Sequence, residues 1–118
     1  MSNQFFGIAV DCVDAGAVAT FWAEVLGRQI AEHPTRENAA VLVDDAAVNG
    51  PRLAFHQVPE PKTVKNRLHL DLIATDFEAE TDRLVSLGAQ KVRDIEKGGN
   101  RWTTFADIEG NEFDLIAG

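Results

Sequence analysis

Cysteine is nearly absent from this chain of 118 residues, and basic residues are few. The single cysteine, Cys12, excludes an internal disulfide and a zinc site built from cysteines. We expect it to be a buried core thiol. With 11 Lys and Arg against 19 Asp and Glu, the formal net charge is -8. Because nucleic acids and anionic membranes are bound mainly by clustered cations, we predict neither of them as a partner.

Long apolar runs and a phosphate-binding loop are also missing. No run of about 18 apolar residues is present, so no membrane-spanning segment is predicted. The N-terminus has no basic segment followed by an apolar run, which is the pattern of a signal peptide, and we therefore expect a cytoplasmic protein. The glycines do not cluster into a phosphate-binding loop, because Gly98-Gly99-Asn100 indicates a hairpin turn. Nothing places a nucleophile beside a histidine base, so no Ser-His-Asp or Cys-His site is predicted.

What is present is a pattern of strands and helices. Phe5 to Cys12 alternates between two faces, and Phe6, Ile8 and Val10 form the face expected to pack under a helix. Asp14 is the predicted N-cap of that helix, and Gly27 ends it. Further strands are expected at residues 29–33, 39–43 and 52–56.

The second half follows the same plan. Arg67 to Ile73 alternates strictly, with Leu68, Leu70 and Leu72 on the face that should pack against a helix. Asp76 is the predicted N-cap of this helix, which Gly88 ends. Three more strands are expected at residues 90–92, 101–106 and 111–116.

The two halves can be overlaid on each other. Each helix closes on a Leu-Gly pair, and each N-cap stands seven residues after a strand position of equal parity, Gly7 in one half and His69 in the other. Self-similarity of this kind indicates a duplication. We therefore predict an α+β fold of two tandem βαβββ units within a single domain, 1–118. The first repeat covers about 4–57, the linker about 58–65 and the second repeat about 66–117. The units should form an open, cup-shaped mixed sheet, with the helices outside and a small-molecule site inside.

Three segments carry a resemblance to a known superfamily. They are Phe21 to Gly27 (FWAEVLG), Asn66 to Leu72 (NRLHLDL) and Asp107 to Phe113 (DIEGNEF). As an ordered set they resemble the glyoxalase-like branch of the vicinal-oxygen-chelate superfamily, which includes glyoxalases, bleomycin-resistance proteins and dioxygenases. The resemblance runs over essentially the whole chain. Ile108 stands where the family usually has Pro, a change that affects the rigidity of the turn more than the chemistry.

The resemblance implies one divalent metal ion, held by a ligand from the first and the last strand of each half. The matching positions here are Gly7, Ala54, His69 and Asp114. Gly7 and Ala54 have no side chain that can bind a metal, so His69 and Asp114 are the implied metal ligands. Catalytic sites usually have about three protein ligands, and the implied set is therefore incomplete.

The residues themselves also predict a polar cluster. By parity, His69 shares a face with Asp71, and Asp114 shares one with Glu112. If the first and last strands of the second half are neighbours, as the resemblance implies, His69 lies close to Asp114. An imidazole among carboxylates can hold a hard cation or perform acid–base chemistry. We assign the catalytic role to His69 and Asp71. The alternative is a structural histidine bonded to an aspartate.

Four further residues are expected to bind the ligand: Arg52, His56, Trp102 and Glu112. Arg52 and His56 share a face with Ala54. Trp102 either stacks on a ligand or is a core or dimer-interface aromatic. Trp22, by contrast, is expected in the core.

The leading hypothesis is a small-molecule enzyme of the glyoxalase-like kind, an isomerase, lyase or hydrolase acting on an oxygenated metabolite. His69 would be its base or its metal ligand. The alternative is a non-catalytic small-molecule or antibiotic-binding protein of the bleomycin-resistance type. A third hypothesis is an accessory module whose cup has lost its ligand, because fold alone does not determine function. A homodimer is expected from the resemblance and from the open sheet edges.

Overall fold

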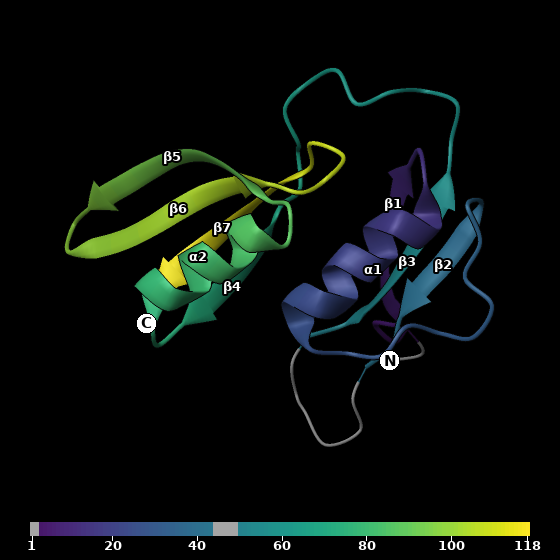
Figure 1. The fold of residues 1–118 in the computed structure, drawn as a ribbon, viewed down its shortest axis with the longest axis horizontal. Helices are drawn as coiled ribbons and strands as arrows, with labels where there is room; N and C mark the ends of the chain where they lie inside the picture. The colour runs from purple at the N-terminus through teal and green to yellow at the C-terminus, as the bar shows by residue number, and fades with distance from the viewer. Residues whose placement is uncertain (1–2, 44–49) are drawn as a thin grey trace. The chain divides into compact units, whose positions relative to one another are not determined.

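The computed structural model describes residues 3–43 and 50–118, and these fold as two compact units, Met1–Pro61 and Lys62–Gly118. Part of the predicted first repeat, residues 44–49, lies outside the described residues. Each unit contains one helix and one sheet, and Figure 1 shows each helix lying along its own sheet. Among the described residues, no helix is long and apolar enough to cross a membrane.

The first unit contains β1 (Gly7–Cys12), α1 (Ala15–Leu26), β2 (Asn38–Val41) and β3 (Arg52–Gln57). The strand order is β1-β3-β2, with β1 parallel and β2 antiparallel to β3. The strand expected at 29–33 is reduced to one bridge, between Ile30 and Val41. Phe6 was expected to pack under the helix. It is 77% exposed, because β1 begins only at Gly7.

The second unit contains β4 (Leu70–Ala74), α2 (Phe77–Ser86), β5 (Gln90–Lys97), β6 (Asn100–Ala106) and β7 (Glu112–Ala117). Its four strands are ordered β4-β7-β6-β5, and β4 runs parallel to β7. Leu68 was expected under the helix, but it is 68% exposed because β4 begins two residues later. Neither sheet closes on itself, so the predicted α+β fold with open mixed sheets is confirmed.

The helix ends follow the local chemistry expected from the sequence. Oδ1 of Asp14 accepts a hydrogen bond of 3.1 Å from the Ala17 amide, and Oδ1 of Asp76 does the same for Ala79. Each cap satisfies one of the backbone amides left free in the first turn. Gly27 ends α1 at φ 62°, a left-handed conformation that glycine adopts without the Cβ penalty.

Each unit has its own apolar core between helix and sheet. In the first, α1 contacts β3, and Val18 and Trp22 of the helix and Phe55 of the strand are all buried, so the expectation for Trp22 is confirmed. In the second, Phe105 and Phe113 are fully buried, with ring centroids 5.6 Å apart. The face of the second sheet that carries these rings packs under α2. Its opposite face is left for other groups.

Candidate functional site

The face of the second sheet that points away from α2 carries two rows of side chains. Residues directly opposite each other on neighbouring strands point to the same face. Asp71 of β4 lies opposite Asp114 of β7, and Asp114 lies opposite Thr104 of β6. Thr104 in turn lies opposite Arg93 of β5. The polar row therefore crosses all four strands.

An apolar row runs beside the polar one. Ile95 lies opposite Trp102, and Trp102 lies opposite Ile116. Both rows line a cavity of about 560 Å³, together with His69, Lys65, Asn100 and Glu112. Volumes of this size are typical of small-molecule sites, as is an apolar wall with a few converging polar groups. We call this space the cavity.

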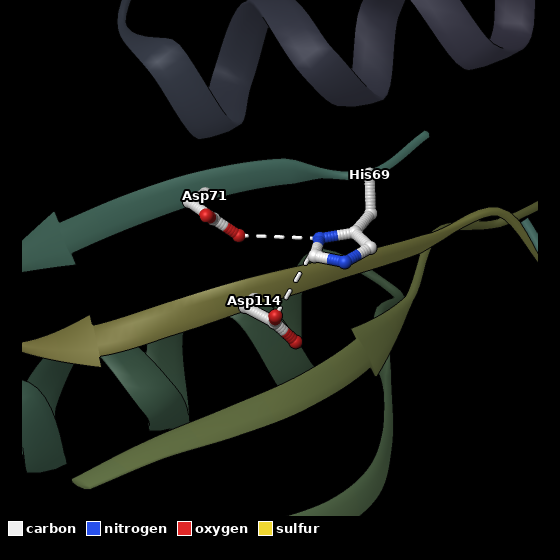
Figure 2. A group of neighbouring side chains, drawn as sticks. All are labelled: His69, Asp71 and Asp114. Atoms are coloured by element: carbon white, nitrogen blue, oxygen red, sulfur yellow. Dashed lines mark hydrogen bonds and ion pairs between the residues drawn. The ribbon is translucent and has the colours of Figure 1, made fainter. Parts of the chain in front are cut away.

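His69 lies at the polar end of the cavity, between two carboxylates (Figure 2). Its Nδ1 is 3.2 Å from Oδ1 of Asp71 and 3.5 Å from Oδ2 of Asp114. The side chain of Asp114 is only 16% exposed, whereas those of His69 and Asp71 are 41% and 55% exposed. The three residues, here called the His69 cluster, thus have one well-buried carboxylate and two partners open to the cavity. The predicted proximity of His69 and Asp114 is present.

Asp114 is held from its other side by a buried hydroxyl. Thr104 is 4% exposed, and its Oγ1 donates a hydrogen bond of 2.6 Å to Oδ1 of Asp114. Since Oδ1 is occupied in this way, Oδ2 is the oxygen that faces His69. A short bond to an ionised acceptor is among the stronger hydrogen bonds in proteins, so this contact fixes the carboxylate plane.

His69 precedes β4, and the segment before it is fastened to the start of β7. The Asn66 amide donates to Oε1 of Glu112, and the Glu112 amide donates to Oδ1 of Asn66, each at 3.2 Å. Oε2 of Glu112 lies 3.1 Å from Nζ of Lys65. The hydrogen bond from Lys65, followed by that from Asn66, lowers the pKa of Glu112. Glu112 lines the cavity, and in this structure its oxygens face these donors.

The His69 cluster has the chemistry of a divalent-cation site. One imidazole nitrogen and two carboxylate oxygens lie within 4.8 Å of one another. Asp71 supplies the third donor that the implied set of His69 and Asp114 lacked. Three protein ligands with open positions suit Zn²⁺, Mn²⁺ or Fe²⁺. The same three groups, without a cation, form a histidine oriented by carboxylates.

The remaining predicted ligand residues divide between the two units. Trp102 and Glu112 line the cavity of the second unit. Arg52 and His56 lie on β3 of the first unit. There, the guanidinium of Arg52 lies 5.2 Å from the centroid of the Phe6 ring, and Nδ1 of His56 is 2.9 Å from Oδ1 of Asn38.

Strand pairing in the first unit repeats that of the second, but the equivalent positions have no side chains that could bind a metal. Ala9 lies opposite Ala54 in the parallel pair β1–β3, as Asp71 lies opposite Asp114 in β4–β7. Gly7 stands two residues before Ala9, as His69 stands two before Asp71. The three positions equivalent to the His69 cluster thus carry Gly and two Ala.

The sequence reasoning missed the other six residues that line the cavity: Lys65, Arg93, Ile95, Asn100, Thr104 and Ile116. Thr104 and Arg93 are the two of these that complete the polar row. Thr104 could have been found by extending the face of Asp114 onto the neighbouring strand. Arg93 could not, because the pairing of β5 with β6 shifts register between Lys91 and Arg93. Such a β-bulge leaves no clear mark in the alternation of the sequence.

Solved structures of similar fold include fosfomycin resistance proteins. A mutant of FosX from Listeria monocytogenes, complexed with Mn(II) and 1S,2S-dihydroxypropylphosphonic acid, has a TM-score of 0.78 at 15% identity, over 100% of this chain and 92% of that one. FosX from Mesorhizobium loti has a TM-score of 0.73 at 17% identity, over 100% and 94%. A glyoxalase-related enzyme from Fulvimarina pelagi has a TM-score of 0.70 at 18% identity, over 98% and 89%. At these identities the likeness concerns the fold.

Sequence comparison identifies the family. No curated protein matches the chain. The glyoxalase-like domain profile matches residues 7–116, which is nearly the whole chain. The expected family resemblance is therefore confirmed: the chain belongs to the glyoxalase-like domain family of the vicinal-oxygen-chelate superfamily.

Proposed function

We propose that this protein is a small-molecule enzyme that acts on an oxygenated metabolite at the His69 cluster, as an isomerase, lyase or hydrolase. The observation that carries the proposal is the position of Nδ1 of His69 between Asp71, at 3.2 Å, and Asp114, at 3.5 Å, on the wall of the cavity. A carboxylate beside Nδ1 holds an imidazole in one tautomer and orientation and stabilises its protonated form. Nε2 is then the nitrogen that exchanges a proton with a ligand.

Each member of the cluster has a distinct part in this reaction. His69 takes a proton from the substrate and returns it, and Asp114, fixed by Thr104, orients the imidazole. Asp71 is the more exposed carboxylate and stabilises the imidazolium from the open side. Trp102 and Ile116 provide the apolar wall that orients the substrate and excludes water from part of the cavity.

A divalent cation fits the same donors. His69, Asp71 and Asp114 would hold it, and when bound it would polarise a carbonyl, hydroxyl or epoxide oxygen of the substrate. The proposed enzyme is a single glyoxalase-like domain and acts as a homodimer.

Two measurements test this function. Wild type and His69→Ala are incubated with a panel of small aldehydes, 2-oxo acids and epoxides, and turnover is followed by NMR. In parallel, the melting temperature is measured with Mn²⁺, Fe²⁺, Co²⁺, Ni²⁺ and Zn²⁺. We expect turnover that His69→Ala abolishes, and a metal-dependent rise in melting temperature that the same variant loses.

A second histidine provides the control. His33 is 93% exposed and has φ 61°, a conformation that Asn tolerates well. His33→Asn therefore removes an imidazole without disturbing the cluster, and it should match the wild type in both measurements. Turnover that survives His69→Ala unchanged would overturn the proposal.

A second candidate function is ligand sequestration without catalysis, as in bleomycin-resistance proteins. The observation that favours it is the replacement of the three cluster positions in the first unit by Gly7, Ala9 and Ala54, none of which has a donor side chain. A binding protein needs fewer reactive groups than an enzyme. Saturable quenching of Trp102 fluorescence, with the ligand recovered intact after long incubation, supports this function, and turnover excludes it.

A further inference from the structure

We propose that Arg93 is the anion-binding residue of the cavity, and that the ligand of this protein is a small organic anion with a short apolar body. The anion is a carboxylate, phosphonate or phosphate. This inference rests on the proposed function of the same cavity and names the class of compound that it accepts.

A β-bulge brings Arg93 to the cavity. Lys91 pairs with Phe105, and Arg93 pairs with the next residue along β6, Thr104, so Val92 is the extra residue. Bulges re-aim the side chains that follow them. Without the bulge, regular alternation would place Val92 opposite Thr104 and Asp94 opposite Trp102. With it, Arg93 and Ile95 take these places. Because of the bulge, the cavity wall carries the cation Arg93 in place of the apolar Val92, and the apolar Ile95 in place of the carboxylate Asp94.

The charge of Arg93 is not neutralised within the described part of the chain. The other cation of the cavity, Lys65, lies 3.1 Å from a Glu112 oxygen, and Lys91 on the same strand lies 2.9 Å from Asp94. For Arg93, no carboxylate of residues 3–43 or 50–118 lies within ion-pair distance. Arginine stays protonated at all physiological pH values, and its planar fork matches the two oxygens of a carboxylate or phosphonate.

The spacing of the strands sets the size of the ligand. Arg93 and Asp114 lie on opposite sides of Thr104 in the polar row, so two strand spacings of about 4.8 Å each separate their backbones. Both side chains line the cavity. A ligand of a few carbon atoms can therefore present its anionic group to Arg93 and its oxygenated end to the His69 cluster.

The apolar row determines the body of the ligand. The apolar row runs alongside the polar row and consists of Ile95, Trp102 and Ile116. It crosses β5, β6 and β7, the same three strands that carry Arg93, Thr104 and Asp114. A ligand that spans the polar row therefore rests on these side chains, and an aliphatic or aromatic spacer is favoured over a polar one. Trp102, in the middle of the row, is a natural reporter for such a ligand.

The test is a binding titration that needs no turnover. The probes are benzylphosphonate, phenylacetate and benzyl alcohol, which share an aromatic body and differ in charge. The readout is the indole N–H signal of Trp102 in ¹⁵N–¹H NMR spectra. The chain has two tryptophans, and Trp22 is buried in the core of the first unit, so its signal is the internal reference. A Trp102→Phe variant assigns the two signals.

We expect both anions to bind at least about tenfold more tightly than benzyl alcohol, the range that charge-assisted hydrogen bonds provide. Arg93→Gln should reduce their affinity to that of the alcohol, and Arg93→Lys should retain part of it. The matched control is Lys91→Gln, which removes the same charge from the same strand on the other side of the bulge and should leave the affinities unchanged. A preference between phosphonate and carboxylate identifies the type of anion.

The outcomes separate this inference from the proposed function. Equal affinity for charged and neutral probes, equal affinity in wild type and Arg93→Gln, or no saturable shift with either anion each overturn the anion site. None of these results depends on catalysis. Conversely, absence of turnover and of metal stabilisation would overturn the enzyme function while anion binding through Arg93 persisted.

Discussion

Thr104 and Asp114 form a pair in which a buried hydroxyl controls the direction of a carboxylate. The hydroxyl donates a hydrogen bond of 2.6 Å to Oδ1, and Oδ2 lies 3.5 Å from Nδ1 of His69. The cross-strand register places the two residues opposite each other on β6 and β7. The buried Thr104 thereby orients the most buried member of the His69 cluster.

The first prediction concerns this hydroxyl. Thr104→Val keeps the shape of the side chain and removes its only donor, so Asp114 loses the bond that fixes its plane. Because Asp114 is largely buried, we expect a loss of about 1–3 kcal/mol in the free energy of unfolding. If the cluster binds a metal, its affinity should fall about 10- to 100-fold, as it does when partners of metal ligands are removed. Urea unfolding and calorimetric titration measure the two effects.

The neighbouring threonine is a matched control. Thr103 is fully buried and also donates a 2.6 Å bond to an aspartate, Asp94, but Asp94 is not among the residues that line the cavity. Thr103→Val should destabilise the fold and leave metal or ligand binding unchanged. If both variants weaken binding equally, Thr104 has a structural role only.

A second prediction follows from the depressed pKa of Glu112. The hydrogen bond from Lys65, then that from Asn66, lowers this pKa below its ordinary value of 4.5. A lowered native pKa stabilises the fold above the ordinary value, and this stabilisation is lost as pH falls through the native pKa. Glu112→Gln should therefore reduce the free energy of unfolding at pH 7, and its difference from wild type should shrink below about pH 4.5.

Unfolding curves at a series of pH values check this behaviour. Glu96→Gln makes the same chemical change at an exposed position of β5 and should have little effect at any pH. A Glu112→Gln variant whose deficit stays constant down to pH 2 would show that the effect is packing, not charge.

The third prediction concerns the start of α2. Asp76→Ala removes the oxygen that accepts the hydrogen bond of the Ala79 amide, and it should lower the free energy of unfolding by about 1 kcal/mol. Asp82→Ala, in the middle of the same helix, should be neutral or slightly stabilising because Ala is the better helix former. Thermal unfolding monitored by circular dichroism measures both. A loss in the two variants alike would indicate a general charge effect and not a cap.

Local chemistry explains which parts of the fold were predictable. Asp14 and Asp76 cap their helices because each side-chain oxygen accepts a hydrogen bond from the backbone amide three residues later. This contact is local, so it forms whatever the helix packs against. The start of β4 was less predictable. Arg67 to Ile73 alternates strictly in sequence, but pairing with β7 begins only at Leu70, and Leu68 therefore stays exposed. Alternation marks the two faces of a segment, whereas strand ends depend on where a partner is available.

The candidate site also has a part that was predictable from the sequence and a part that was not. His69 and Asp114 were expected to be close because the resemblance implied that their strands are neighbours, and parity then places the side chains on one face. Arg93 depends on an irregularity of pairing with β6, which involves residues of two strands. Its position follows from tertiary structure alone.

The last prediction addresses the first unit, where Gly7 occupies the place of His69. A Cβ atom added to Gly7 would stand 2.7 Å from the backbone oxygen of Arg52, closer than side chains are found to approach. Because that oxygen belongs to the paired strand β3, it cannot move without disturbing the sheet. Gly7→Ala should therefore lower the free energy of unfolding by about 1–3 kcal/mol, the usual cost of overpacking. Ala9→Thr, at an exposed position of the same strand, should leave it nearly unchanged. Chemical denaturation of both variants measures the two effects. If Gly7→Ala were as stable as wild type, the glycine would not be a steric requirement, and Gly7→His would become the direct test of whether a second histidine can be restored.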